Sequence, residues 1–429
     1  TATNGAYWSV YGPNGQRVGS YYNNSTDFTV NLPSNGEYYL VLEGYSNSNF
    51  SYSFQVNDIS DATVTPSGFG TTQTGTIAAG QTATFNYTGN AGQFLFFDSL
   101  DVDYDSIQVE LRYSDNTLVY SGNASNDYST FVLPRSGNYT VTVRGSSTNS
   151  IGDYSFRLLD LNSNSTALTL GTAVSGTLTN PSETRVLRFT GAVGQRLYFD
   201  SLDVDYDSIS ALIVGPSGNT VLSNNNASYD RDLFTLTEAG TYYLVLSGTG
   251  TTGTPDYNFN LLTPPTTNLA FDTAITANLA AQETELYQFT GTAGQRLYFD
   301  SQTTGVSGSW SLYGPNNQYI TGSGLSGDFQ ATLSNDGTYV LVIQGSTTAA
   351  NFNFQVVTPT TTTSALTLNT PISGTISELG EQDIYTFTGT VGQQLYYDNL
   401  KTDTSDTLRA YLVSPSGSTS LLNQDADYD

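Results

Sequence analysis

Two segments with the same letters, FDSLDVDYDSI, carry the side chains best suited to chemistry. Each holds four aspartates at identical offsets: Asp98, Asp101, Asp103 and Asp105 in the first, and Asp200, Asp203, Asp205 and Asp207 in the second. In an extended chain the alternating acids would project to one side. Closely spaced carboxylates repel one another, and Ca²⁺ relieves that repulsion by accepting about six to eight oxygen ligands. The spacing therefore predicts calcium at both segments.

Further oxygen ligands are expected from an Asn- and Asp-rich segment later in each unit: Asn126 and Asp127 in the first, Asp230 and Asp232 in the second. A third copy, FDSQTTGVSGSW, keeps only Asp300, and a fourth, YDNLKTDTSDTL, has Asp398, Asp403 and Asp406 at a different spacing. Calcium is thus expected in some units only. The run lacks the glycine and final glutamate of a helix-loop-helix calcium loop. A solvated acidic loop without metal is the alternative.

Paired carboxylates are also the machinery of glycoside hydrolysis. These acids, however, belong to a repeated phrase, no pocket-forming insertion accompanies them, and one unit lacks most of them. The chain has no histidine, the commonest general base, and no cysteine for disulfides or metal–thiolate sites. We therefore expect a protein that is not an enzyme.

Charge excludes other classes of partner. Lys and Arg number 12 against 38 Asp and Glu, which gives a formal net charge of −26. Such an excess repels nucleic-acid phosphates and anionic membranes. No apolar run approaches the roughly 20 residues of a membrane helix. We expect neither nucleic-acid binding nor membrane insertion, and an acidic surface also keeps a protein soluble.

The acidic segments belong to a repeat of about 100 residues. The phrase LRFTGAVGQRLYFDSL from Leu187 recurs with Gly-Gln pairs that begin at Gly92, Gly194, Gly294 and Gly392. A second phrase, such as AGTYYLVLSG from Ala239, and a closing phrase, such as DYSFRLL from Asp153, also recur in order. A fixed period of this kind indicates a tandem array of one structural unit.

Within each unit, apolar and polar residues alternate over short runs that are bounded by Gly, Pro, Asn and Ser. This pattern predicts an all-β protein of tandem antiparallel jelly-roll-like β-sandwich domains of about 100 residues in a linear array, with most Tyr and Phe in the cores. The Thr- and Pro-rich joins are predicted to be short extended linkers. The predicted domains are a partial sandwich at 1–60, complete repeats at 61–162, 163–264 and 265–359, and a partial sandwich at 360–429.

Both ends of the sequence fall inside a unit, since Trp8 matches Trp310 and Asp429 matches Asp230. Two explanations fit. The residues are a window on a longer chain of repeats, or the two partial sandwiches complete each other between subunits. The second would be a head-to-tail contact that generates filaments. Self-association or neighbouring repeats are expected under either.

The units resemble the bacterial pre-peptidase C-terminal domain family. The resemblance rests on the ordered phrases FTGTAGQRLYFDS, GTYYLVL and DYSFRLL, and it is similar in kind to arrays in large secreted cyanobacterial proteins. It implies a jelly-roll-like sandwich, an extracellular or cell-surface location, and calcium near the acidic loops in some members. It also implies accessory modules of secreted enzymes or binding to insoluble polymer.

Two classes of function follow. The leading one is a structural repeat protein that forms a rod, sheath or filament on or outside a bacterial cell, with calcium rigidifying some domains. The alternative is a set of tandem modules in an adhesin or enzyme that bind a polymer such as extracellular polysaccharide, where copies add avidity. A repeated exposed aromatic patch would favour the second, but Trp occurs only at Trp8 and Trp310.

Overall fold

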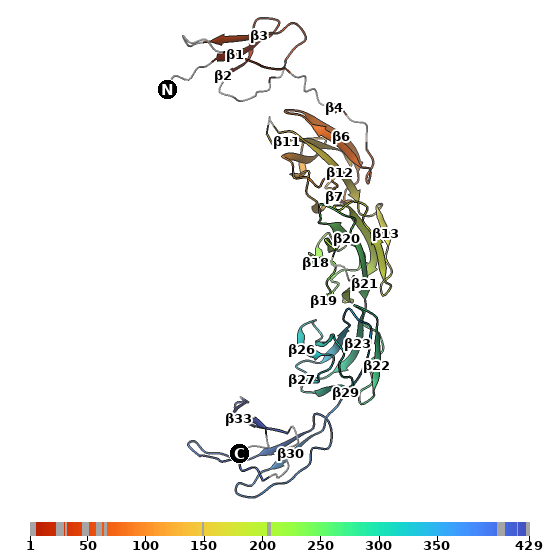
Figure 1. Ribbon diagram of the computed structural model, residues 1–429, viewed down its shortest axis with the longest axis vertical. Helices are drawn as coiled ribbons and strands as arrows, with labels where there is room; N and C mark the ends of the chain where they lie inside the picture. The colour runs from red at the N-terminus through yellow and green to blue at the C-terminus, as the bar shows by residue number, and fades with distance from the viewer. Residues whose placement is uncertain are drawn as a thin grey trace. The chain divides into compact units, whose positions relative to one another are not determined.

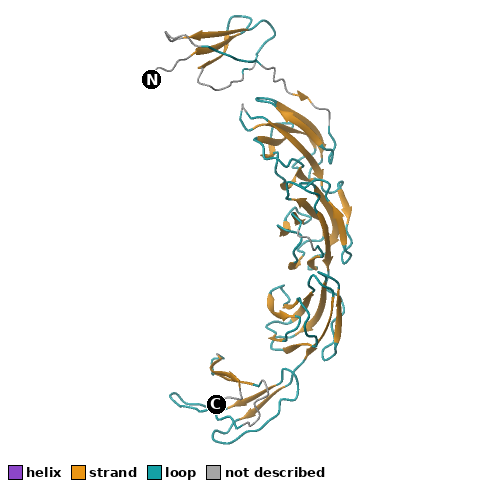
Figure 2. Ribbon diagram, in the orientation of Figure 1, coloured by secondary structure: helices purple, strands orange, loops and turns teal. Residues whose placement is uncertain are grey.

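A computed structural model describes residues 6–22, 30, 32–44, 51–56, 62–63, 67–147, 150–203, 207–400, 408–417 and 419–425. Every regular element in these ranges is a β-strand (Figure 2). The chain divides into two compact units, Thr1–Thr358 and Pro359–Asp429. In the ranges given above, no helix is long and apolar enough to cross a membrane. The all-β prediction is confirmed.

The first complete sandwich, which we call domain A, is made of strands β4 to β12 (Figure 1). One sheet has the order β10-β7-β12-β5, and the other has the order β4-β6-β11-β8-β9. The bounds are β4 (Ala62–Thr63), β5 (Gln73–Ile77), β6 (Thr82–Gly89), β7 (Phe94–Ser99), β8 (Ile107–Tyr113), β9 (Leu118–Asn123), β10 (Tyr128–Val132), β11 (Gly137–Gly145) and β12 (Gly152–Asp160).

Domain B repeats this topology with the sheets β14-β21-β16-β19 and β13-β15-β20-β17-β18. Its strands are β13 (Ser165–Ala167), β14 (Val174–Thr177), β15 (Thr184–Gly191), β16 (Arg196–Ser201), β17 (Ile209–Val214), β18 (Thr220–Asn224), β19 (Arg231–Thr235), β20 (Gly240–Gly248) and β21 (Asp256–Leu262).

Domain C has the sheets β22-β29-β24-β27 and β23-β28-β25-β26. Its strands are β22 (Ile275–Leu279), β23 (Thr284–Gly291), β24 (Arg296–Ser301), β25 (Ser309–Tyr313), β26 (Tyr319–Gly324), β27 (Phe329–Thr332), β28 (Gly337–Gln344) and β29 (Ala350–Val357).

The terminal parts contain fewer described strands. Near the N-terminus, β1 (Ala6–Tyr11), β2 (Arg17–Tyr22) and β3 (Tyr39–Gly44) form a sheet in the order β2-β1-β3. In the unit Pro359–Asp429, β30 (Thr361–Ala365) pairs with β31 (Gln382–Thr386), and β32 (Arg409–Val413) pairs with β33 (Thr419–Asp425).

The joins differ from the plain linkers that were predicted, because they contribute edge strands. β13 pairs in parallel with Val186–Arg188 of β15, and β30 pairs in parallel with β31. A sheet edge offers unpaired N–H and C=O groups, so an extended Thr-rich segment that passes alongside gains hydrogen bonds without needing core side chains. In domains A and B the pairings of β4 with β6 and of β13 with β15 are the parallel exceptions in otherwise antiparallel described sheets, whereas β30 and β31 form a two-stranded parallel sheet.

The recurring Gly-Gln pair closes a turn between two core strands. Gly92, Gly194, Gly294 and Gly392 all have φ between 78° and 84°, a left-handed conformation that favours glycine. The glutamine side chain then accepts a hydrogen bond from the backbone N–H three residues earlier, as Gln195 does from Ala192 at 3.1 Å. The same bond recurs at Gln93, Gln295 and Gln393. The phrase is therefore a structural turn.

Each complete sandwich has its own apolar core between its two sheets. Aromatic rings dominate these cores, and Trp310 is fully buried in that of domain C, where it contacts Phe299, Phe329, Phe352 and Phe354. Its indole N–H donates to the Gly327 carbonyl at 3.0 Å. Trp310 is therefore a core residue of domain C.

Two further apolar clusters lie between sandwiches rather than within them. Phe96, Leu159 and Leu161 of domain A pack against Val186, Tyr243 and Val245 of domain B. Tyr198 and Leu233 of domain B pack against Tyr313, Val340 and Val342 of domain C. We call these contacts the A/B junction and the B/C junction. They bury the outer faces of β7 and β16, so these strands are apolar on both sides.

Candidate functional site

The acidic run of domain A lies in the loop between β7 and β8, and it is not a strand as the alternating pattern suggested. Asp101 is buried and accepts hydrogen bonds from the Asp103 N–H at 3.1 Å and the Ser125 hydroxyl at 3.2 Å. Asp105 accepts from the Asp153 N–H, at the start of the closing strand, at 3.0 Å. These acids already act as ties that hold the loop to its neighbours.

Domain B repeats the ties, with Asp203 accepting from Ser228 at 2.8 Å and Asp207 from the Asp256 N–H. Asp205, Asp403 and Asp406 lie outside the described residues. In domain C a threonine hydroxyl, Thr303, bonds to Asn353 of β29 instead. Because a neutral hydroxyl can tie this loop to the closing strand, domain C folds without the acids.

The described side chains form no cluster of acidic metal ligands. Nowhere in the described ranges do three or more His, Cys, Asp or Glu side chains gather as metal ligands. Calcium at the acidic loops therefore stays a prediction from the sequence.

The later loop supplies one aspartate with a shared role in all three domains. Asp127, Asp230 and Asp328 accept hydrogen bonds from the N–H groups of Ser99, Ser201 and Ser301 at 2.7–2.8 Å. Each serine ends a central strand, where the edge strand no longer provides an acceptor. The structure thus places Asp127 and Asp230 at the strand ends and the junctions.

At the A/B junction, Asp98 forms an ion pair instead of a metal site. Asp98 is fully buried, and its Oδ2 accepts from Arg157 Nε at 2.6 Å. The same guanidinium donates to the Thr184 carbonyl of domain B at 3.1 Å and lies 3.6 Å from Glu183. One arginine therefore joins the two domains. Burial raises the pKa of the Asp98 carboxyl, and the Arg157 charge opposes that rise.

Asp127 lies next to this pair. Its Oδ2 accepts from the Thr184 hydroxyl at 3.2 Å, and that hydroxyl is 2.8 Å from the Ser247 hydroxyl. Burial, and then repulsion from Asp98, raises the pKa of Asp127. Two carboxylates, one arginine and hydroxyl donors from domain B thus form a polar network at the A/B junction, in which Asp98 Oδ1 is buried without a hydrogen-bond partner in the described structure.

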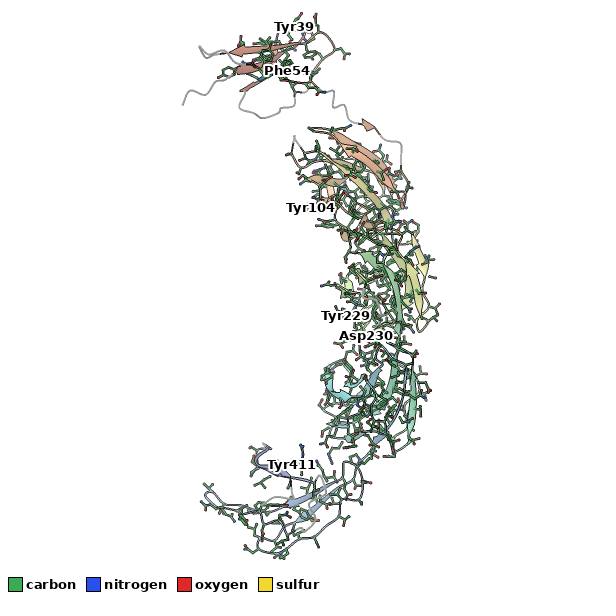
Figure 3. The ribbon with its side chains drawn as sticks, viewed as in Figure 1. Tyr39, Phe54, Tyr104, Tyr229, Asp230 and Tyr411 are labelled. Atoms are coloured by element: carbon green, nitrogen blue, oxygen red, sulfur yellow. The ribbon has the colours of Figure 1, made fainter. Side chains whose placement is uncertain are left out.

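The B/C junction has the same plan with more hydrogen bonds, and Figure 3 labels Asp230 there. Asp230 Oδ2 accepts from Tyr198 at 3.0 Å, from Gln344 at 2.8 Å and from Thr284 at 3.3 Å. Asp232 accepts from the Tyr313 hydroxyl at 2.7 Å. Asp230 and Asp232, both expected as calcium ligands, therefore face donors of the next domain.

Arg196 adds a further link at the B/C junction. Its guanidinium donates to the Asn317 side chain at 2.6 Å and to the carbonyls of Gly314 and Thr338 at 3.0 Å. Gly314 and Asn317 belong to the β25–β26 turn of domain C, so this turn is held against β16 of domain B. At the A/B junction Phe94 takes the equivalent place and packs on Tyr243.

Asp200 differs from Asp98 in having no arginine partner. The two are equivalent, but the cross-strand neighbour of Asp98 is Arg157 and that of Asp200 is Asn260. Asp200 is 1% exposed, and burial followed by repulsion from Asp230 raises the pKa of its carboxyl to about 8. Asp200 Oδ1 and Asn260 Oδ1 are both buried without a hydrogen-bond partner within the described structure.

Sequence reasoning missed these junctions. Asp98, Asp127, Asp200, Asp230 and Asp232 were expected to bind calcium, whereas they lie where one domain packs on the next. A signal was present in the phrases FLFFDS and RLYFDS, whose apolar residues do not alternate with polar ones. Such runs are typical of strands that are buried on both faces.

No family model matches the chain, and no curated protein matches it. Its similarity to solved structures is distant. The CUB1-EGF-CUB2 region of human MASP-1/3 is 11% identical, with 44% of this chain and 99% of that chain covered and a TM-score of 0.16. The secreted serine protease VesC from Vibrio cholerae is 10% identical, with 59% and 72% covered and a TM-score of 0.19.

A triple jelly-roll protein from the turret of an archaeal virus is 13% identical, with 65% of this chain and 82% of that chain covered and a TM-score of 0.16. Matches at these TM-scores assign neither family nor function. The chain is a protein of multiple β-sandwich domains with distant jelly-roll-like neighbours.

Proposed function

We propose that this chain is a non-enzymatic structural array, extracellular or on a bacterial cell surface, whose successive sandwiches are locked together to build a rod, sheath or filament. The observation that supports the proposal most is the pair of apolar junctions between domains A, B and C. Flexibly tethered binding modules do not need to bury residues such as Tyr243 and Val342 against a neighbour. A stiff structural array needs such contacts, because buried apolar surface between domains fixes the angle between them.

The hydrogen bonds across the junctions support the same function. Arg157, Arg196 and Asp230 each contact the next domain at defined atoms, which gives each junction a single orientation. Such directional contacts restrain rotation about the join, while the edge strand β13 restrains the linker itself. The resemblance to pre-peptidase C-terminal domains is part of this proposal, because members of that family are extracellular.

The absence of native cysteine offers a direct test. Thr251 in domain B and Thr348 in domain C are exposed and can be changed to cysteine for a pair of spin labels. A locked junction gives one narrow distance distribution by pulsed electron paramagnetic resonance. A broad distribution, as expected for modules on a flexible tether, would contradict the proposal.

The second candidate, tandem modules that bind polysaccharide, has weaker support. Tyr104 and Tyr229 are exposed, but the equivalent positions in domain C are not aromatic. Stacking on a sugar chain by successive modules needs aromatic faces at equivalent positions. We expect no co-sedimentation of the chain with insoluble polysaccharides such as cellulose or chitin, and saturable co-sedimentation would favour this candidate over the first.

Calcium at the acidic loops of domains A and B is a part of the proposal that rests on the sequence alone. Domain C is a natural control, because Thr303 stands where the other domains have Asp101 and Asp203. If calcium binds, a chelator lowers the unfolding temperatures of domains A and B and leaves that of domain C unchanged. Unfolding temperatures that are the same in chelator and in millimolar calcium would contradict calcium binding. They would leave the proposal of a structural array unchanged.

A further inference from the structure

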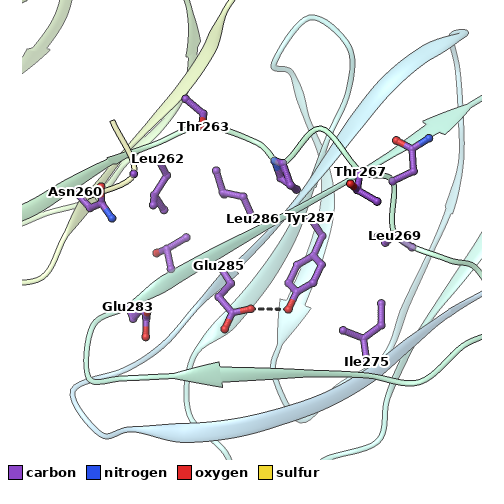
Figure 4. A pocket seen from close by; sticks show the side chains of 14 residues that line it. Asn260, Leu262, Thr263, Thr267, Leu269, Ile275, Glu283, Glu285, Leu286 and Tyr287 are labelled. Carbon is purple, nitrogen blue, oxygen red and sulfur yellow. Dashed lines mark hydrogen bonds between the residues drawn. The ribbon is translucent and has the colours of Figure 1, made fainter. Parts of the chain in front are cut away.

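A groove lies beside each of the two junctions, and the two grooves are lined by residues at equivalent positions of the repeat but differ in size. Beside the A/B junction it is lined by Arg157, Glu183 and Thr184 among others and encloses about 110 Å³. Beside the B/C junction it is lined by the equivalent Asn260, Glu283 and Thr284, and its volume is about 560 Å³ (Figure 4). The repeat thus provides an internal comparison: one groove contains an arginine side chain, and in the other that side chain is replaced by a shorter one.

Arg157 shows what the smaller groove is built to hold. Its guanidinium contacts the Asp98 carboxylate, the Thr184 carbonyl and the Glu183 carboxylate, so acceptors surround the fork of N–H donors. This arrangement matches the planar geometry of a guanidinium group. Asp98, Thr184 and Glu183 correspond to Asp200, Thr284 and Glu283 at the B/C junction.

The larger groove is lined by two of these equivalents, Glu283 and Thr284, with Asp200 buried behind its lining, and it lacks the cation. Asn260 Oδ1 is a buried acceptor without a donor in the described structure, at the position where Arg157 supplies donors in the smaller groove. Asp200 Oδ1 is unpartnered there too, as is Asp98 Oδ1 at the other junction, and Asp200 is 1% exposed. Arg185 of the smaller groove is replaced by Glu285, whose carboxylate binds the Tyr287 hydroxyl (Figure 4). Among the lining residues of the larger groove, all of which are described, none is Lys or Arg. No cation among the lining residues therefore faces the Glu283 and Glu285 carboxylates.

We propose that the groove at the B/C junction binds a guanidinium group supplied from outside the chain, in the place that Arg157 occupies at the A/B junction. The group lies between Asp200 and Glu283, donates to the Thr284 carbonyl and the Asn260 side-chain oxygen, and joins domain B to domain C. The ligand is an alkyl guanidine: either an arginine side chain of a partner protein or a free arginine derivative. This site does not depend on the filament proposal.

The donor set favours a guanidinium over a metal ion. A calcium ion requires about six to eight oxygens, and the described residues nowhere gather three acidic side chains. A guanidinium needs fewer acceptors, spread in a plane, and its weak hydration suits a partly apolar groove. The apolar wall of the groove, which includes Leu262, Leu269 and Ile275, suits the alkyl part of the ligand.

Isothermal titration calorimetry of the 429-residue chain at low salt tests the site. L-Arginine amide is the probe, and L-citrulline amide, which is isosteric but lacks the guanidinium charge, is its control. We expect one arginine amide per chain and binding of citrulline amide at least about tenfold weaker. A blocked Gly-Arg-Gly tripeptide distinguishes the sources: tighter binding than that of arginine amide assigns the site to a partner protein, and weaker binding to a free derivative.

Two matched variants complete the test. Asn260→Arg supplies the cation from within and should abolish binding, whereas Arg157→Asn should open the A/B groove and raise the stoichiometry to two per chain. If Arg157→Asn does not fold, as judged by circular dichroism, Asn260→Arg decides alone. Absence of heat with arginine amide up to about 20 mM, unchanged binding in Asn260→Arg, or calcium binding that Asn260→Arg abolishes would each overturn the proposal.

Discussion

At the scale of single residues, Asp98 and Asp200 occupy equivalent positions in the repeat but differ in how their buried carboxyl groups are compensated. Both aspartates are buried at a junction by the domain that follows. Arg157 compensates the first, while Asn260 leaves the second with only neutral donors nearby. Asp230 and Glu283 repel the Asp200 carboxylate and raise its pKa in addition to burial, and the Tyr198 hydroxyl is a further titratable group close to it. A buried carboxyl without a cation holds its proton to higher pH.

We expect this difference to appear in stability against pH. Because the folded-state pKa of Asp200 is raised to about 8, its favourable contribution is fully present below the ordinary pKa near 4 and is lost as the pH rises toward 8. Asp200→Asn, which mimics the protonated form, should stabilise domains B and C by about 2 kcal/mol at pH 8.5 and have little effect at pH 4. Chemical denaturation of both proteins across this range measures the difference.

The matched variant is Asp98→Asn. It should destabilise the A/B junction by about 3 kcal/mol, because it removes the closer of the two carboxylates that pair with the buried Arg157 charge and leaves only Glu183 at 3.6 Å. If Asp200→Asn stabilises the protein and Asp98→Asn destabilises it, the difference comes from Arg157, since asparagine is introduced in both variants. If both substitutions destabilise equally at pH 8.5, Asp200 does not carry the pH dependence.

At the scale of elements, the Gly-Gln turn is the most repeated device in the chain. Gly194 at φ 79° turns the chain, and the Gln195 side chain satisfies the Ala192 N–H. We expect Gln195→Ala to destabilise domain B by about 1 kcal/mol, since one turn hydrogen bond is lost. Gln195→Glu keeps an acceptor and should restore most of that stability. Thermal denaturation of the two variants checks the expectation, and equal losses would assign the effect to another contact.

The sequence predicts the turns and most of the strands, but not the edge strands that the joins contribute. The phrases with Gly92, Gly194 and Gly294 predict the turns, and the alternating runs predict strands, because both signals are local. The parallel edge strand β13 was not predicted, since the Thr-rich join gains its hydrogen bonds only from a distant neighbour. Sequence patterns do not carry such pairing information.

The candidate site shows the same limit more sharply. The run Asp101–Asp105 predicted metal ligands because equal charges are adjacent in sequence, but the donors that satisfy Asp101 and Asp105 come from Ser125 and Asp153. The guanidinium groove could be found only by comparing Arg157 with Asn260 at two junctions, which requires knowing that both positions face the next domain. The alternation of apolar and polar residues along one strand does not indicate which residues contact the neighbouring domain.

At the scale of the whole molecule, the junctions decide whether domains A, B and C behave as one body or as three. The outer face of β20 in domain B presents Tyr243 and Val245, and the outer face of β28 in domain C presents Val340 and Val342. The equivalent residues on β11 of domain A are Thr140 and Thr142. The apolar faces therefore belong to the two domains that are seen docked on a preceding one.

This pattern gives a test of coupling between domains. Val342→Lys places an unpaired charge in the B/C junction and should cost about 3 kcal/mol. Because Val342 belongs to the B/C cluster and not to the core of domain C, that core should remain intact while its unfolding separates from that of domain B. Differential scanning calorimetry should resolve a new transition at lower temperature. Thr142→Lys on the polar face of domain A is the control and should change the thermogram little. If Val342→Lys leaves the transitions merged, or unfolds domain B and domain C together, the domains are not joined through this face, and the stiffness proposed for the array would have to come from the linkers alone.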